Sequence, residues 1–272
     1  MKNDMVNDNI NNNNMNKSDT MDYKLLIDTA ALAGTLMLKH GAEIYRVEET
    51  INYMLSISNL KTTVAFVMST GLFISLDDPS IDALTVVRRV NSCDTNLDMV
   101  AKVNSISRNL YNGTISLEDA FYMLKHLDDK LYPWWLKDIS ILMVAVFFTG
   151  MFGGTALDMT FNLIVGICLA AWLHLGRFIR LNPLIMDLLS SVIISSVASI
   201  LVRNVNGLHL DLIIIGAIML LVPGAAITNA IRDTLHGDYA AGSARILEAF
   251  VKAALIALGV YIGFIITGTM KI

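Results

Sequence analysis

Five apolar runs follow one another in the second half of the chain, each close to the roughly 20 residues that cross a bilayer core as a helix. They cover residues 139–157, 161–179, 184–202, 210–230 and 246–267. Lipid offers no hydrogen-bond partner to an open backbone, so such runs are typical of membrane-spanning helices. We therefore expect an integral membrane α-helical bundle of about five transmembrane helices over residues 138–268, with the lipid bilayer around it.

Charged residues are concentrated before this bundle. The chain of 272 residues is 54% hydrophobic and only 16% charged, with a formal net charge of −4. This balance gives no basic surface, so we expect no nucleic-acid partner. Cys93 and Cys168 form no paired-cysteine motif, and the sequence predicts no metal site, no catalytic residue and no cofactor.

The polar first half has two parts. Residues 1–20 are rich in asparagine and lack an apolar block, which predicts a disordered tail without a cleavable export signal. Residues 21–133 have the pattern of a folded α+β domain. Apolar spacing predicts helices near residues 25–41, 44–57, 97–111 and 116–127, and β-branched runs predict two or three strands within residues 62–90. We expect the helices on one face of a small antiparallel sheet.

Basic residues near the ends of the apolar runs predict their orientation. They are Lys125, Lys130 and Lys137 before the first run, Arg177 and Arg180 between the second and third, and Arg232 and Arg245 between the fourth and fifth. These segments should be cytoplasmic. The sequence thus predicts a multi-pass protein of the cell (plasma) membrane with a cytoplasmic N-terminus, a cytoplasmic α+β domain and an extracytoplasmic C-terminus.

The most distinctive local feature is Pro223-Gly224, which falls near the middle of the fourth run. Proline lacks an amide donor, so the helix should kink or break there. A break would point the positive N-terminal end of a half-helix into the membrane, where transporters hold anionic substrate groups. Asn229, Arg232 and Asp233 follow one to two turns later. A simple packing kink explains the same residues equally well, since Pro and Gly are frequent in membrane helices.

Other polar residues in the runs are weaker signals. Asp187 lies about one turn into the third run and is costly to place in lipid, which makes it a candidate substrate residue. The small residues Ser191, Ser195 and Ser199, together with the pair Gly259 and Gly263, favour close helix packing. Lys252 follows Glu248 by four residues, and we expect these two to form an ion pair.

A charged motif opens the second helix of the α+β domain. Gly41 is placed to end the preceding helix in a left-handed conformation. Glu43 and Glu48 complement the dipole of the new helix, and Arg46 can pair with Glu49 at three-residue spacing. A carboxylate that acts as a general base is the alternative interpretation, although the sequence offers it no nucleophile or metal partner.

Four separated segments carry a family resemblance. They are HGAEIYRVEETI (40–51), VMSTGLFISL (67–76), RRVNSCDTNLDMVAKVNSISRNLYNGTISLEDA (88–120) and LVPGAAITNAIRDTLHGD (221–238). In these segments, and over about residues 28–267, the chain resembles the N-terminal part of the threonine/serine exporter family. The resemblance implies a cytoplasmic domain joined to five helices in an exporter of threonine and serine or, in two-component members, of dicarboxylates such as succinate.

The resemblance also implies a partner. Full-length members carry a second block of helices, so we expect this chain to be of the split form, in which a small integral membrane protein supplies the C-terminal half. We expect an oligomer with that partner and export of a small carboxylate-bearing molecule. No GxxxxGK[ST] phosphate loop occurs, so an ion gradient or a separate subunit would drive transport.

Two other functions fit the sequence. A membrane-anchored hydrolase would use Glu43 and Glu48, with the helices as an anchor, and a regulatory subunit would leave transport to its partner. We favour the exporter and do not expect an enzyme. The predicted substrate-binding residues are Pro223, Gly224, Asn229, Arg232, Asp233 and Asp187, and the cytoplasmic motif comprises Gly41, Glu43, Arg46 and Glu48.

Overall fold

The computed structural model describes residues 21–90, 95–128, 132–179 and 181–269, which form two compact units. The N-terminal unit comprises Met1–Asp129 with Arg232–Ala241, and the helical unit comprises Lys130–Ile231 with Gly242–Ile272. A segment between the fourth and fifth apolar runs is thus grouped with the N-terminal unit. The predicted tail at residues 1–20 lies outside the described residues, as do Cys93, Lys130 and Arg180.

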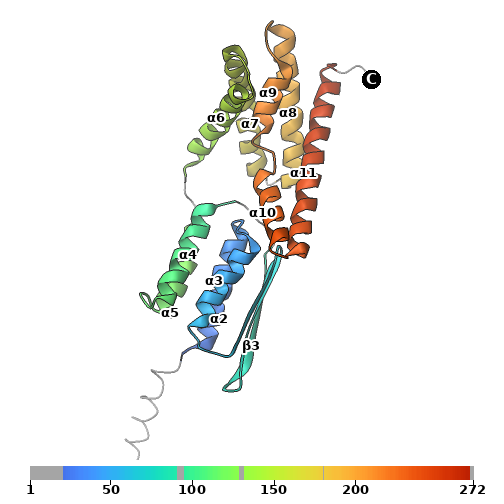
Figure 1. Ribbon diagram of the computed structural model, residues 1–272. Coiled ribbons are helices and arrows are strands. Elements are labelled where there is room, and N and C mark those ends of the chain that lie inside the picture. The colour runs from blue at the N-terminus through green and yellow to red at the C-terminus, as the bar shows by residue number, and fades with distance from the viewer. Residues whose placement is uncertain (1–20, 91–94, 129–131, 180, 270–272) are drawn as a thin grey trace, which may run out of the picture. The chain divides into compact units, whose positions relative to one another are not determined.

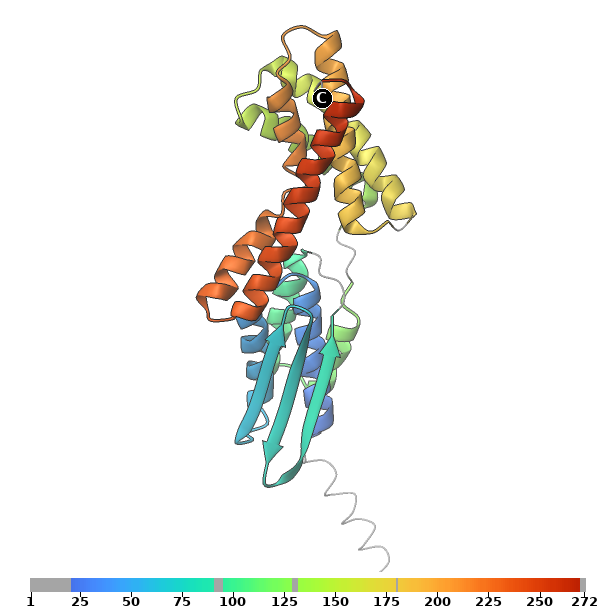
Figure 2. The same cartoon turned by 90° about the vertical axis from the view of Figure 1, so that its right-hand side faces the viewer.

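The N-terminal unit combines helices with one small sheet. Its elements are α2 (Tyr23–Lys39), α3 (Ile44–Ser56), β1 (Thr62–Met68), β2 (Gly71–Asp78), β3 (Ile81–Arg89), α4 (Leu97–Tyr111) and α5 (Leu117–Lys125). The strands pair antiparallel in the order β1-β2-β3. Figure 2 shows the helices on one face of this sheet. The predicted α+β pattern is confirmed, with three strands.

The core of this unit lies between the sheet and the helices that cover it. Leu26, Ile51 and Leu72 are fully buried there, and they come from α2, α3 and β2. A Cβ atom added at Gly34 would lie 2.6 Å from Ile51 Cδ1, so α2 and α3 pack closely. Gly41 has a φ of +81°, which confirms the predicted left-handed end of α2 and turns the chain directly into α3.

The helical unit contains the apolar runs. Its helices are α6 (Trp134–Met151), α7 (Ala156–Phe178), α8 (Pro183–Asn204), α9 (Leu210–Ile218), α10 (Gly224–Leu235) and α11 (Tyr239–Ile266), of which α10 ends and α11 begins in the N-terminal unit. Within the described residues, α6, α7, α8 and α11 are long and apolar enough to cross a membrane. The fourth run, expected as one span over residues 210–230, instead forms the two shorter helices α9 and α10 (Figure 1).

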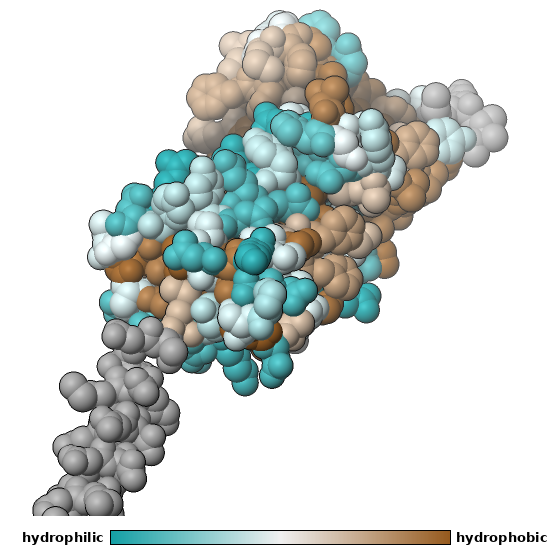
Figure 3. Space-filling model, turned by 60° about the horizontal axis from the view of Figure 1, so that its bottom comes forward, coloured by the Kyte–Doolittle hydropathy of each residue, from teal (hydrophilic) through white to brown (hydrophobic). Residues whose placement is uncertain are grey.

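Many apolar side chains of the helical unit face outward. Phe147, Leu247 and Phe250 are all exposed. In the face that Figure 3 shows, hydrophobic residues cover much of this unit, whereas hydrophilic residues gather over the N-terminal unit. Water would disfavour such a surface and lipid would not, which agrees with a bundle that spans a membrane.

Small residues bring α8 and α11 together. A Cβ added at Gly259 would overlap the Leu188 carbonyl oxygen and lie 2.8 Å from Ser191 Cβ. A Cβ added at Gly263 would overlap the Ser195 hydroxyl and lie 2.9 Å from the Val192 carbonyl oxygen. The predicted packing role of the serines and of this glycine pair is therefore confirmed, because only a residue without a side chain allows the two backbones to approach in this way.

We predict that Gly259→Leu lowers the free energy of unfolding by about 3 kcal/mol, since the new side chain meets backbone atoms of α8 that cannot move aside. Thermal unfolding in detergent, followed by circular dichroism, measures the effect. The control is Ala257→Leu, which adds the same bulk to an exposed position of α11. Equal unfolding midpoints for the two variants would show that the α8–α11 contact is not tight.

Candidate functional site

The interruption of the fourth apolar run creates the first part of the candidate site. Helix α9 ends at Ile218 and α10 begins at Gly224. In the link between them, the Leu221 amide donates to the Ile218 carbonyl at 2.7 Å, and Pro223 has no amide hydrogen to continue a helix. The predicted break is therefore present, and it separates the run into two half-helices.

The start of α10 is open. Gly224 is exposed, and a Cβ added to it would meet nothing within 4 Å. The first amides of any helix, here those of Ala225 and Ala226, lack acceptors within the helix, and the helix dipole adds a partial positive charge at the same end. This end of α10 can therefore accept a carboxylate. Asn229, another predicted site residue, is half-buried further along the same helix.

The other half-helix, α9, is fixed at its start by a buried carboxylate. Asp158 is fully buried at the beginning of α7. Its carboxylate accepts hydrogen bonds from the Thr155 amide at 2.9 Å and from the His209 amide at 2.8 Å. The His209 Nδ1 atom also lies 3.0 Å from Asp158 Oδ2. One carboxylate thus caps α7 and holds the residue that precedes α9.

A second buried polar contact fixes α9 near its middle. The Asn162 side-chain amide donates to the Ala145 carbonyl of α6 at 3.0 Å and to the Ile213 carbonyl of α9 at 3.1 Å. It also contacts the Thr149 hydroxyl. A Cβ added at Gly216 would lie 2.8 Å from the Thr149 amide nitrogen, so α6 and α9 touch through their backbones. These contacts make α9 a fixed part of the bundle.

Asp158, Asn162 and His209 were not among the predicted site residues. Two signals in the sequence point to these positions: Thr155 and Asp158 have the three-residue spacing of a capping box, and Asn162 is a polar residue within an apolar run.

Asp187 has a cation beside it. The Lys252 ammonium of α11 lies 3.2 Å from the Asp187 carboxylate of α8. Our expectation that Lys252 would pair with Glu248 on its own helix is wrong, because a contact between two packed helices competes with the local spacing. The protein itself therefore balances the charge of Asp187.

The charged motif at the start of α3 forms a second cluster, within the N-terminal unit. The Glu43 carboxylate lies 3.2 Å from Arg46 Nε and also forms a hydrogen bond with Arg232. Our expectation that Arg46 would pair with Glu49 is corrected, because the carboxylate within ion-pair distance of Arg46 is that of Glu43, which also pairs with Arg232. A hydrogen bond with the Tyr45 side chain, and next the charge of Glu43, hold the pKa of Arg46 above its usual value despite some burial.

Asp233 completes this cluster. Its buried carboxylate accepts a hydrogen bond from the Ile44 amide, the first of α3, at 3.1 Å. This is the cap that Glu43, at the N-cap position, does not provide with its own side chain. The rings of Tyr45 and His236 stack with centroids 4.3 Å apart. We call these contacts between Glu43–Tyr45 and Arg232–His236 the α3–α10 junction.

Glu48 lies further along α3 and faces the sheet. Its carboxylate accepts the Val67 amide of β1 at 2.9 Å. Burial raises the pKa of Glu48, the hydrogen bond from Val67 opposes that shift, and the negative charge of Asp238 adds to it. Glu43 and Glu48 are thus both engaged with protein groups. In the described part of the chain, no group of three or more metal-ligating side chains accompanies them.

Glu48 predicts a dependence of stability on pH. Because the folded-state pKa exceeds the ordinary value of 4.5, the folded protein binds the proton more tightly than the unfolded chain does. Its contribution to stability is therefore complete below pH 4.5 and is lost as the pH rises through the folded pKa. Glu48→Gln keeps the acceptor for Val67 and removes this loss. We expect the unfolding midpoint of Glu48→Gln to lie above that of the wild type, and we expect the difference between them to be larger at pH 7 than at pH 4. The same difference at both pH values would contradict this.

Comparison with known proteins adds the following. The family described as "Putative threonine/serine exporter" matches residues 28–267. An uncharacterized protein of Schizosaccharomyces pombe is 26% identical over 256 residues, which cover 86% of this chain and 29% of that protein. The chain therefore spans less than a third of the length of this relative. No solved structure matches the chain.

Proposed function

This chain belongs to the threonine/serine exporter family, and on that premise we propose that it exports threonine and serine by way of its interrupted membrane segment. The family is one of transporters and not of enzymes, and the apolar helices make this a multi-pass membrane protein. Dicarboxylates such as succinate form the second substrate class that we propose to test.

The observation that carries this proposal is the open start of α10. Threonine and serine both carry a carboxylate, and a helix N-terminus inside a membrane protein attracts such a group with amides and dipole together. Gly224 leaves room beside those amides. Pro223 keeps the preceding residues from continuing α9 as one helix, so the amides stay available to substrate.

Helix α10 also offers a way to link substrate binding to the N-terminal unit. It is one continuous helix, and its last residues, including Arg232 and Asp233, make the α3–α10 junction. Its other end is the proposed substrate end, next to the fixed helix α9. We propose that a shift of α3 moves α10 and so changes access to the substrate, which makes Arg232 and Asp233 coupling residues.

The proposal also covers the orientation of the chain in the membrane, the driving force for export and the partner protein. We place the N-terminal unit in the cytoplasm because basic residues gather at the membrane ends on that side. We propose an ion gradient as the driving force, with a separate energy-supplying subunit as the alternative, since the sequence has no phosphate-binding loop. We propose that a small membrane protein completes the transport path, as the resemblance to the split members of the family implies.

We predict that Gly224→Leu lowers threonine export by about tenfold or more with little loss of stability. A Cβ atom at this position meets nothing within 4 Å, so the new side chain has room to enter, but it occupies the space that substrate needs. Release of labelled threonine from loaded cells measures export, and the unfolding midpoint in detergent measures stability. Ala257→Leu, on an exposed face of α11, is the control. Export at the wild-type rate by Gly224→Leu would rule out the start of α10 as the substrate site.

A further inference from the structure

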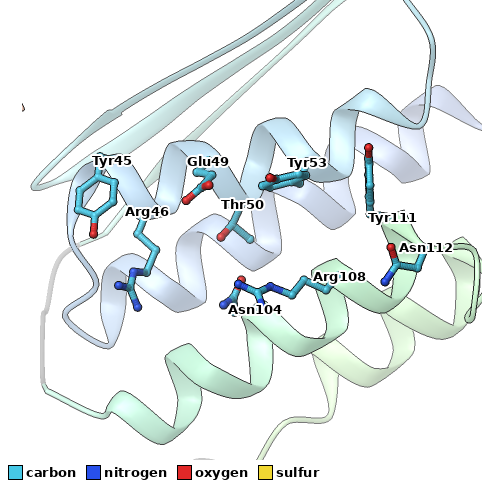
Figure 4. A pocket seen from close by; sticks show the side chains of 9 residues that line it. All are labelled: Tyr45, Arg46, Glu49, Thr50, Tyr53, Asn104, Arg108, Tyr111 and Asn112. Carbon is cyan, nitrogen blue, oxygen red and sulfur yellow. The ribbon is translucent and has the colours of Figure 1, made fainter.

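A polar groove lies between α3 and α4 in the N-terminal unit, next to the α3–α10 junction, with which it shares Tyr45. Its volume is about 370 Å³, and its walls include Arg46, Glu49 and Tyr53 of α3 and Asn104, Arg108 and Tyr111 of α4. Figure 4 shows these side chains in two rows, one on each helix. A volume of this size is in the range of small-molecule sites.

The sequence explains why polar side chains line this groove. Arg46, Glu49 and Tyr53 follow the three- and four-residue spacing of one helix face, and so do Asn104, Arg108 and Tyr111. The apolar residues on neighbouring faces, such as Val47 and Val103, are buried in the core. The two helices thus pack through their apolar faces and leave two polar rows beside each other at the surface.

The charges in the groove are separated. Arg46 is already paired with Glu43. Arg108 forms no ion pair with a carboxylate anywhere in the described ranges. Glu49 supplies an exposed negative group on the opposite wall. The groove therefore presents a guanidinium without a counter-ion on one side and a carboxylate on the other.

Aromatic residues extend the groove beyond Glu49. Tyr53 and Tyr111 meet edge to face with ring centroids 5.3 Å apart. A second hollow of about 400 Å³ shares Glu49, Tyr53 and Tyr111 with the first. Tyrosine faces attract an ammonium group, and tyrosine hydroxyls can bond a polar side chain.

We propose that this groove binds a small α-amino acid and so lets the N-terminal unit sense the substrate. Arg108 holds the carboxylate with two parallel hydrogen bonds, and Glu49 with the tyrosine faces holds the ammonium. Asn104 is placed to bond a side-chain hydroxyl. The choice of threonine and serine as ligands rests on the proposed export function, whereas the requirement for both charges of an amino acid rests on the groove itself.

Binding of a ligand in the groove can alter the α3–α10 junction through Arg46. Arg46 lines the groove and also contacts Glu43, which contacts Arg232. A carboxylate beside Arg108 adds negative charge near Arg46 and competes with Glu43 for it. Binding in the groove would therefore change the junction that holds the end of α10.

Equilibrium dialysis of labelled threonine against the full chain in detergent tests the proposal, with Gly224→Leu as the background so that the membrane site is blocked. We expect threonine to remain bound in this background, and we expect Arg108→Gln to weaken that binding by roughly tenfold or more. Glu49→Gln should weaken it as well. Lys102→Gln is the matched control, because Lys102 lies on α4 but pairs with Asp98 outside the groove.

Three results would overturn the proposal. They are loss of all threonine binding in Gly224→Leu alone, equal binding by Arg108→Gln and Lys102→Gln, and competition by succinate as strong as that by unlabelled threonine. The last result would show that one carboxylate suffices and that Glu49 holds no ammonium. The dialysis experiment measures binding and not transport, so its result does not depend on whether the chain exports threonine. The export assays test the export proposal separately.

Discussion

Asp158→Ala is expected to lower the free energy of unfolding of the helical unit by about 4 kcal/mol and to abolish export. The change removes a fully buried carboxylate and leaves the partly buried amides of Thr155 and His209 without their acceptor. Helix α9 would lose its fixed start, and the open end of α10 would lose the support beside it. Thermal unfolding in detergent and release of labelled threonine from cells measure the two effects.

Asp211→Ala is the matched control for this prediction. Asp211 also carries a carboxylate in the first turn of α9, but it is exposed. Its loss should cost only a few tenths of a kcal/mol through the helix dipole. If Asp158→Ala were as stable as Asp211→Ala, the polar contacts around Asp158 would not be what fixes α9.

The second large effect is expected at the α3–α10 junction. Glu43→Gln and Arg232→Gln should each lower export by about tenfold, because either change breaks the ion pair between α3 and the end of α10. The double variant should export no worse than either single variant, since the same contact is lost in all three. Release of labelled threonine, corrected for the amount of protein in the membrane, gives this double-mutant cycle.

Another ion pair of the same unit serves as the control. Asp98 and Lys102 pair on the surface of α4, and exposed pairs of this spacing contribute little. Asp98→Asn and Lys102→Gln should therefore export normally. Multiplicative losses in the Glu43 and Arg232 double variant would show that the two residues act independently, which contradicts a coupling role for the junction.

Local signals allowed much of the N-terminal unit to be predicted. The predicted helix over residues 97–111 has the bounds of α4, because Asn96 caps its start and Asn112-Gly113 stops it. Ser116 caps α5 as the spacing to Asp119 indicates. Gly41 has the left-handed conformation that its position after α2 predicts. In each case the residues that decide the structure lie within one or two turns of each other.

Contacts between distant segments could not be predicted in this way. The hydrogen bond between Ile44 and Asp233 joins residues 189 positions apart, and no periodicity connects them. The sequence placed Glu43 and Arg232 in two separate motifs, and only the fold shows that they meet. Lys252 was assigned to its helical neighbour Glu248 for the same reason, whereas the packing of α11 on α8 brings it to Asp187.

The structure of the fourth apolar run could be predicted only in part. Pro223-Gly224 predicts a break from chemistry alone, and α9 and α10 confirm it. Which of the two half-helices is held in place depends on Asp158 and Asn162, which belong to another helix. The open space at Gly224 likewise depends on what neighbouring helices leave free, and sequence spacing carries no information about that.

Efflux of labelled threonine from right-side-out membrane vesicles tests the central claim most directly. The vesicles would come from cells that produce this chain at its native level, from cells that lack it, and from cells that produce Gly224→Leu or Ala257→Leu. Under an imposed ion gradient, we predict rapid efflux with the wild type and with Ala257→Leu, and slow efflux in the other two preparations. Equal efflux with and without the chain, under proton and sodium gradients and for serine as well as threonine, would contradict its role as an exporter.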